Sequence, residues 1–287
     1  MRALLLLTLA LAPAILQAQS AEDLRNWNQP FPPHHIAGNL YYVGTNDLGC
    51  FLVTTKAGHI LINTGLEQSV PLIRESVEKL GFRFADIRIL LASQGHYDHV
   101  AGHALARKLT GAKVFVMRGD EGVVRDGGAS DFYYADQMRW AACPVDRVLA
   151  DGDRVELGGT TLIAHRTAGH TKGCTTWTMT ATEEGKPLHV VIVGGVNVNP
   201  GFRLVANAKY PSIADDFAAT FRTLAGLDCD IFVGAHGGYY GLAEKYARSR
   251  TEGWKAFVDP AGYRAFVARS ERAFQEKLRA QQAGRTP

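Results

Sequence analysis

Three side chains of types that bind zinc, His96, Asp98 and His99, fall within four positions of one another. They belong to the segment 93–99 (SQGHYDH), in which Gln94 is a fourth potential ligand. Gln94 and His96 are two positions apart, so both can point the same way from an extended backbone. Asp98 and His99 are adjacent and diverge, a spacing that suits two metal ions better than one. Imidazole and carboxylate groups are ligands that Zn²⁺ accepts, so the segment is a candidate metal site.

The alternative is a polar loop whose histidines cap a helix and contact water. That interpretation is preferable for a single histidine, but here four potential ligands occupy six residues. Two further histidines also follow small residues downstream, His170 in the segment 168–170 (AGH) and His236 in the segment 234–236 (GAH). Small residues let the backbone approach a metal closely. We therefore predict that all three segments contribute to one metal centre.

The elements around these segments place them at strand ends. The apolar run at residues 87–92 predicts a buried strand before the 93–99 segment, and a helical pattern at residues 100–109 follows it. Strands predicted at residues 160–165 and 231–233 precede the two other histidines. Open α/β folds carry their chemistry at such strand ends, so the three segments can meet at one edge.

The remaining pattern predicts one domain of the α/β class. Further strands are expected at residues 40–43, 51–55, 59–63, 113–117, 154–157, 175–180 and 188–193, and helices at residues 67–80, 213–224 and from about residue 262. Residues 21–38 are rich in proline and aromatic residues and are expected to lie over the domain as an arm. Strands inside and helices on both outer faces predict an αβ/βα four-layer sandwich spanning residues 21–287.

Composition and the N-terminus indicate an exported protein without nucleic-acid partners. The chain has 287 residues and a net charge of +3, which is too weak and scattered to favour nucleic acid. Arg2 precedes an apolar run at residues 3–16, and the small residues that a signal peptidase requires follow at residues 18–20. We predict a signal peptide over residues 1–20, export to the periplasm, and no membrane association after the signal is removed.

Four cysteines, Cys50, Cys143, Cys174 and Cys229, are too widely separated for a zinc finger or ribbon. They allow three disulfide pairings, and the sequence neither chooses among these nor excludes free buried thiols. Cys174 follows His170 by four positions, but it begins a predicted strand, so we expect a buried thiol there.

His103 lies four positions after His99 and is expected to be exposed or to lie behind the ligands, without binding metal itself. The loop at residues 126–137 is expected to present exposed aromatic side chains as a wall for a ligand.

The segments resemble the metallo-β-lactamase superfamily. Residues 61–65 (LINTG), 94–99, 169–173 (GHTKG) and 234–236 fall in the order and spacing of that superfamily, and the likeness covers nearly all of the mature chain. Within it, the chain is similar to subclass B3 enzymes, and to the GOB-type variants whose ligand motif begins with glutamine. The resemblance implies two zinc sites with three ligands each: Gln94, His96 and His170 at the first, and Asp98, His99 and His236 at the second.

The implied activity is hydrolysis of the β-lactam amide bond of penicillins, cephalosporins and carbapenems by a zinc-bound hydroxide, which confers antibiotic resistance. In this scheme Asp98 is the catalytic residue that orients the nucleophile, one or two Zn²⁺ ions bind per chain, and the enzyme is a monomer. Gln94 offers a neutral amide oxygen, which is a poorer donor than imidazole, so the first site should be the weaker one.

The alternative activity is that of another metal-dependent hydrolase of the superfamily, such as a lactonase or thioesterase. Those enzymes resemble one another in carrying an aspartate that bridges both metals after the strand equivalent to residues 188–193. Here residues 193–197 read VGGVN, with no acid. The missing acid favours the B3 arrangement.

Lys172 is a candidate for binding the substrate carboxylate. It lies two positions after His170, in a turn expected to face the open side of the metals. A solvated turn lysine is an equally good interpretation. Arg203 and Lys209, in the loop after residue 200, compete for the same role.

Overall fold

Two β-sheets pack face to face in the computed structural model, which describes residues 21–135 and 137–285. The first sheet follows the order of the sequence: β1 (His34–Ala37), β2 (Leu40–Tyr42), β3 (Phe51–Thr55), β4 (Gly58–Ile62), β5 (Ile87–Leu91), β6 (Lys113–Met117) and β7 (Arg147–Leu149). The second has the order β12 (Ile231–Gly234), β11 (Lys186–Val193), β10 (Thr175–Glu183), β9 (Thr160–Arg166) and β8 (Arg154–Leu157). The signal peptide predicted for residues 1–20 lies outside the described residues.

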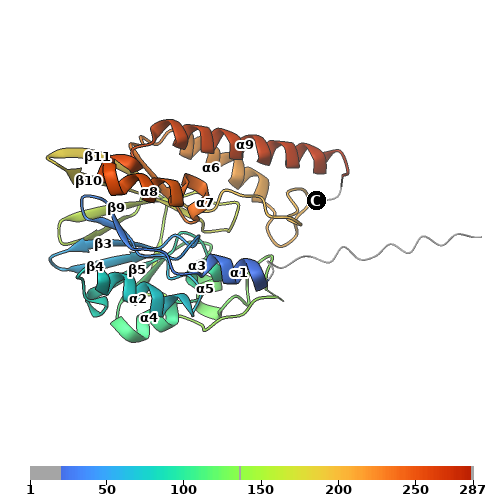
Figure 1. Cartoon of the computed structure of the whole chain (residues 1–287). Coiled ribbons are helices and arrows are strands. Elements are labelled where there is room, and N and C mark those ends of the chain that lie inside the picture. The colour runs from blue at the N-terminus through green and yellow to red at the C-terminus, as the bar shows by residue number, and fades with distance from the viewer. Residues whose placement is uncertain (1–20, 136, 286–287) are drawn as a thin grey trace, which may run out of the picture.

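Helices cover the outer face of each sheet (Figure 1). α2 (Ser69–Lys79) and α4 (His103–Thr110) lie against the first sheet, and α6 (Ile213–Ala225) and α9 (Pro260–Gln282) against the second. The shorter helices are α1 (Ala21–Trp27), α3 (Tyr97–Val100), α5 (Glu121–Asp126), α7 (Gly237–Tyr240) and α8 (Leu242–Glu252), with 3₁₀ turns η1 (Phe84–Asp86) and η2 (Gly253–Phe257). No described helix is both long and apolar enough to span a membrane. The predicted αβ/βα four-layer sandwich is confirmed.

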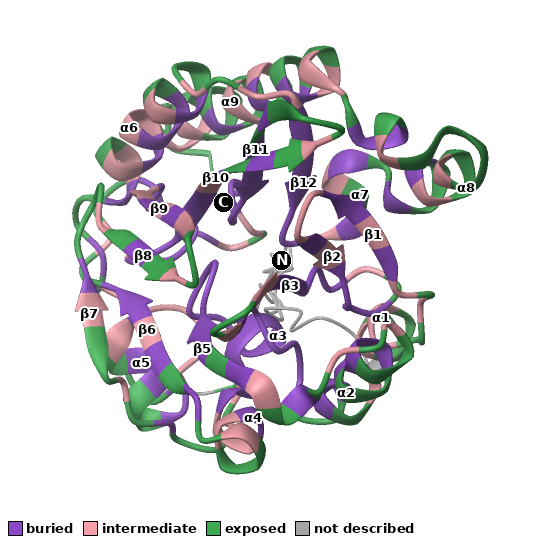
Figure 2. Cartoon of the chain, turned by 90° about the vertical axis from the view of Figure 1, so that its left-hand side faces the viewer, coloured by how far each residue is buried: buried purple, intermediate pink, exposed green. Residues whose placement is uncertain are grey.

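Apolar side chains from both sheets form the core between them. Trp177 of β10 is fully buried there together with Tyr42 and Phe51 of the first sheet. A second apolar cluster fills the space between the first sheet and α2, whose Val70 and Ile73 face inward at helical spacing. Figure 2 shows the same division, with strands mostly buried and exposed residues concentrated on the outer helices. Both faces of the central strands are therefore covered, which explains their continuous apolar runs.

The structure corrects the helix predicted over residues 100–109. That region forms two helices, and the first, α3, begins at Tyr97, so Asp98 and His99 lie in a helical turn and not in a loop. The helix breaks before α4 because Gly102, which packs against the loop after β4, donates its N–H to the carbonyl of Gly65 at 3.1 Å and not to a helical carbonyl. A Cβ on Gly102 would lie 2.6 Å from the carbonyl oxygen of Thr64.

Two edge strands, β1 and β7, were not predicted from the sequence. β1 lies in the expected arm, where the sequence HHIA lacks the apolar alternation of a strand. His34 is nevertheless buried, because its ring stacks on Tyr42 and Phe257. Its hydrophobic surroundings come from other elements, so the local sequence did not indicate them.

Candidate metal centre

The three segments predicted to carry ligands meet at one end of the two sheets. Residues 94–99 follow β5, His170 lies in the turn between β9 and β10, and His236 follows β12. Two hydrogen bonds join the sheets beside them. Thr175 N–H donates to the carbonyl of Ser93 over 2.7 Å, and the indole N–H of Trp177 donates to the carbonyl of Ala92 over 3.1 Å. These hydrogen bonds fix the positions of the two sheets relative to each other next to the ligand segments.

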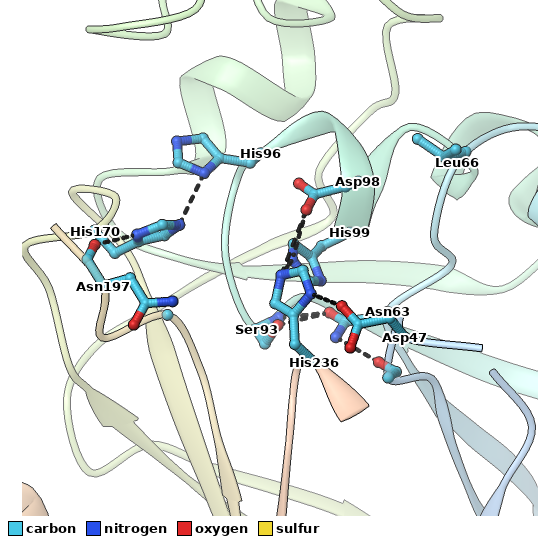
Figure 3. A network of polar contacts seen from close by, with 12 residues as sticks. Asp47, Asn63, Leu66, Ser93, His96, Asp98, His99, His170, Asn197 and His236 are labelled. Atoms are coloured by element: carbon cyan, nitrogen blue, oxygen red, sulfur yellow. Dashed lines mark hydrogen bonds and ion pairs between the residues drawn. The ribbon is translucent and has the colours of Figure 1, made fainter. Parts of the chain in front are cut away.

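Asn63 holds the start of the 93–99 segment. Its Oδ1 accepts hydrogen bonds from Ser93 N–H at 2.8 Å and from Ser93 Oγ at 3.0 Å, while its Nδ2 donates to the carbonyl of Gly49 at 2.9 Å (Figure 3). Asn63 has φ +64°, a left-handed conformation that asparagine tolerates better than most residues. Asn63 thus connects three loops beside the site: its own after β4, the loop before β3 and the loop after β5.

Asp98, His99 and His236 form a compact group of potential metal ligands. One ligand atom of each lies within 4.8 Å of the others. Nε2 of His99 lies 3.2 Å from Nε2 of His236 and 3.2 Å from Oδ2 of Asp98 (Figure 3). One carboxylate oxygen and two ring nitrogens therefore converge on one point, which is the donor set expected for Zn²⁺. The expectation that the adjacent side chains of Asp98 and His99 diverge was wrong, because both lie in the first turn of α3 and meet at 3.2 Å.

Asp47 fixes the orientation of His236. Its Oδ2 accepts a hydrogen bond from Nδ1 of His236 at 2.7 Å, and its Oδ1 accepts one from Gly238 N–H at 2.9 Å. Nδ1 of His236 carries its proton toward this carboxylate, so Nε2 presents a lone pair toward Asp98 and His99. Asp47 was not predicted from the sequence, because nothing in its loop distinguishes it from a solvated turn acid.

The charged groups of this cluster stabilise one another. Burial alone raises the pKa of Asp98, but the neighbouring imidazoles of His99, His236 and His96 outweigh burial and hold it below its usual range. Burial lowers the pKa of His236, yet the hydrogen bond to Asp47 and the charge of Asp98 together raise it. Asp98 is therefore an anion within a group of imidazoles.

His96 and His170 form a second, uncharged group. Nδ1 of His96 lies 3.1 Å from Nε2 of His170 (Figure 3). Burial lowers the pKa of His96 to about 4 and that of His170 to about 3, so both rings are neutral near pH 7. Nδ1 of His170 donates to the carbonyl of Asn197 at 2.7 Å. Because that carbonyl can only accept, Nε2 of His170 presents a lone pair toward His96.

Gln94 is buried with both polar atoms of its amide lacking a hydrogen-bond partner among the described residues. A buried amide that makes no hydrogen bond costs free energy, so an unpartnered pair in a native protein calls for an explanation. A metal ion beside His96 and His170 would supply a partner for the Oε1 atom of Gln94. The orphaned amide and the facing ring nitrogens fit the predicted zinc ligands.

A cavity of about 240 Å³ opens beside both groups. It is lined by Trp27, Asp47, His96, Asp98, Tyr134, His170, Asn197, Asn199, His236, Gly238 and Tyr239. Trp27 belongs to α1, and its ring meets that of His236 edge-on at 5.4 Å. The N-terminal arm therefore forms part of the wall, whereas the sequence indicated only that it lies over the domain.

The loop at residues 126–137 differs from its prediction. Its aromatic side chains are not exposed: Phe132 and Tyr133 are half-buried and Tyr134 is buried. Asn199 Nδ2 donates to the Tyr134 hydroxyl at 3.1 Å, which ties the loop to the segment after β11. Tyr134 still forms a wall of the cavity, with its ring 5.0 Å from that of His96.

Other candidates lie away from the cavity lining. Lys172 is half-buried, with its ammonium 5.7 Å from the centre of the Tyr210 ring, while Arg203 and Lys209 are exposed. His103 is fully buried and lies 2.8 Å from Thr64 Oγ1, which also donates to the carbonyl of His99, so it is not exposed and lies behind a predicted ligand.

All four cysteines are free. Cys174 is a buried thiol, as predicted, and burial raises its pKa to about 12. Its sulfur accepts a hydrogen bond from Gly195 N–H at 2.9 Å.

Residues 50–236 match the family described as the metallo-beta-lactamase superfamily. This match covers more than half of the chain and contains every predicted metal ligand. The chain belongs to the metallo-β-lactamase superfamily.

Solved structures of metallo-β-lactamases are closely similar. The native FEZ-1 enzyme from Legionella gormanii is 48% identical, with a TM-score of 0.87 over 88% of this chain and 98% of that one. GOB-18 from Elizabethkingia meningoseptica is 36% identical, with a TM-score of 0.84 over 89% and 95%. The class B3 di-zinc enzyme LRA-12 from an Alaskan soil metagenome is 34% identical, with a TM-score of 0.85 over 91% and 97%. The prediction of an enzyme of the metallo-β-lactamase kind is confirmed.

Proposed function

We propose that this protein is a zinc-dependent β-lactamase with the B3 arrangement of ligands. The observation that carries the proposal is the convergence of two donor groups beside one cavity. Gln94, His96 and His170 constitute the proposed first site, and Asp98, His99 and His236 the proposed second site. The similarity to FEZ-1, GOB-18 and LRA-12 supports the β-lactam amide as the bond that is cleaved. Penicillins, cephalosporins and carbapenems are the proposed substrates, and a periplasmic monomer is the proposed form.

When bound, zinc supplies Lewis-acid chemistry and lowers the pKa of water near the substrate carbonyl. The residues of this chain supply the geometry. Asp98 is anionic and borders the cavity, so its carboxylate can accept a hydrogen bond from an attacking water and orient it. Asp47 keeps His236 Nε2 aimed at the proposed second site. Trp27 and Tyr134 form part of the cavity wall beside these residues.

The segment after β11 argues against the lactonase and thioesterase alternative. The stretch at residues 193–197, after the strand that those relatives follow with a bridging aspartate, holds no acid, and its Gly195 packs directly against the proposed ligand His170. A Cβ on Gly195 would lie 2.4 Å from Cδ2 of His170, closer than van der Waals contact permits. An acidic side chain therefore cannot occupy this position without displacing His170.

Metal removal combined with a choice of substrates tests the proposal. The purified protein, freed of metal by exhaustive chelation and verified by metal analysis, should lose hydrolysis of a chromogenic cephalosporin. Added Zn²⁺ should restore it. Full activity after verified metal removal would contradict a metal-dependent mechanism. A homoserine lactone or a thioester turned over faster than the cephalosporin would favour the alternative activity.

A further inference from the structure

Asp120 is a buried carboxylate outside the proposed metal sites. It immediately precedes α5 and is 1% exposed. Burial raises the pKa of its carboxyl to about 6, and hydrogen bonds to the charged form oppose the rise. A carboxyl group is costly to bury unless it is hydrogen-bonded, so its partners indicate what it does.

Three hydrogen bonds connect Asp120 to two turns. Its Oδ2 accepts from Gly95 N–H at 2.7 Å and from Thr171 Oγ1 at 2.6 Å, and its Oδ1 accepts from Gly173 N–H at 2.7 Å. Gly95 stands between Gln94 and His96, and Thr171 directly follows His170. One carboxylate thus binds both turns that carry the proposed first site.

The two turns also pack tightly against Asp120. A Cβ on Gly95 would lie 2.9 Å from Cγ of Asp120, and one on Gly173 would lie 2.6 Å from its backbone nitrogen. Both backbone donors belong to glycines, which have no Cβ, so each turn can approach Asp120 without a side-chain clash. Neither turn can shift relative to Asp120 without breaking a hydrogen bond or making a clash.

The proposed second site is held differently. Within residues 21–135 and 137–285, Asp120 makes no hydrogen bond to Asp98, His99 or His236. Asp47 orients His236 from another loop. The two outer carboxylates therefore act on different halves of the metal centre.

We propose that Asp120 is a positioning residue for the proposed first site. It sets the spacing between the turn at residues 94–96 and the turn at residues 170–173, and so the 3.1 Å approach of His96 to His170. This inference rests on the proposed function only in taking those residues as zinc ligands. Partners that orient metal ligands typically change metal affinity about 10- to 100-fold when they are replaced.

Asp120→Asn is the sharpest variant, because it preserves shape and removes one acceptor. If the new amide nitrogen replaces Oδ1, Gly173 N–H loses its acceptor. If it replaces Oδ2, Gly95 N–H loses its acceptor, although the Thr171 hydroxyl can rotate to accept. One backbone donor is left unpaired in either orientation, so one ligand turn is released.

Asp146→Asn is the matched control. Asp146 Oδ2 also accepts from a backbone N–H, that of Val114 at 2.8 Å, and its carboxylate pairs with Arg107. It lies at the edge of the first sheet and has no hydrogen bond to a ligand turn. Its loss should lower thermal stability without changing metal affinity.

The measurement is titration of the metal-free protein with Zn²⁺ against a chromophoric chelator, together with the visible spectrum of the Co²⁺-substituted protein. Gln94→Ala identifies the binding step that belongs to the proposed first site. In Asp120→Asn that step should weaken about 10- to 100-fold, and the other step should change less than about threefold. The Co²⁺ bands of the first step should shift, and Asp146→Asn should match the parent.

Unchanged affinity at both steps, or equal weakening of both, would overturn the positioning role. If Asp120→Asn does not fold, Thr171→Val removes one of the three bonds at nearly constant shape, and it should weaken the same step several-fold. An unchanged step in that variant would equally overturn the role. A parent that binds zinc in two steps but cleaves no β-lactam contradicts the proposed function and leaves the positioning test intact.

Discussion

The two halves of the metal centre are built from different chemistry. The proposed second site contains a carboxylate, and its ligand atoms lie within 4.8 Å of one another. The proposed first site has no charged ligand, and its Gln94 amide makes no hydrogen bond among the described residues. Neutral donors attract a dication less strongly than a carboxylate does. The same edge of the fold therefore offers one strong and one weak position for zinc.

The hydrogen-bond partners of His236 and His170 also differ in charge. Asp47 accepts a hydrogen bond from His236 Nδ1, and a carboxylate behind a histidine increases the basicity of its ligating nitrogen. His170 instead donates to the carbonyl of Asn197, which is a neutral and weaker partner. Charge among the ligands is thus confined to the proposed second site, whereas carboxylates lie behind both sites, because Oδ2 of the buried Asp131 lies 3.7 Å from Nε2 of His96 at the first.

The largest expected effect separates Asp98 from Gln94. Asp98→Ala removes the only anionic ligand and the group that orients the nucleophile, so we expect hydrolysis to fall by more than about 100-fold. Gln94→Ala removes one neutral ligand and should cost less. Cephalosporin turnover at matched zinc content measures both variants, and equal losses would contradict the ranking.

Asp47→Asn should weaken zinc binding at the proposed second site by about 10- to 100-fold. The amide no longer supplies the negative charge that faces Nδ1 of His236, so Nε2 becomes a poorer donor. Zinc titration of the metal-free variant gives the affinity of each step. Asp120→Asn is the natural counterpart, because it should affect the other step. Weakening of the same step by both variants would remove the distinction between the two halves.

Gln94→His should strengthen the proposed first site. Imidazole is a better zinc ligand than an amide oxygen, and we expect about tenfold tighter binding, or about 1.4 kcal/mol. The melting temperature of the metal-free protein should change little, since the ligand lies at a strand end outside the core. Zinc content after dialysis against limiting metal measures the effect. A variant that retains no more zinc than the parent would show that Gln94 is not the weak ligand.

Lys172→Ala should have the smallest effect, and it tests which cation meets the substrate carboxylate. An ion pair at a half-exposed site is worth about 1 kcal/mol or less, so we expect KM to rise several-fold with kcat nearly unchanged. For a neutral ester of the same substrate, the KM values of parent and variant should differ little. If ester and acid are affected alike, Arg203 and Lys209 become the residues to test.

Local patterns predicted the bounds of several strands correctly. β3, β6 and β8 have the predicted bounds, because short apolar or alternating runs between turn residues define such strands. β1 was missed because its buried histidine is covered by rings from distant elements. The break between α3 and α4 was missed because it depends on contacts of Gly102 with the distant loop after β4.

The sequence by itself determined which donor atoms are present, in what order, and that strand ends deliver them. Residue type and short spacing are local properties, so histidines and carboxylates within a few positions can be recognised directly. The tertiary structure alone decided which donors face each other and which groups stand behind them. Asp47 lies 189 positions from His236, and Asp120 lies 53 positions from Gly173. Such pairings arise only when the two sheets pack, because a hydrogen bond across that distance depends on every element between them.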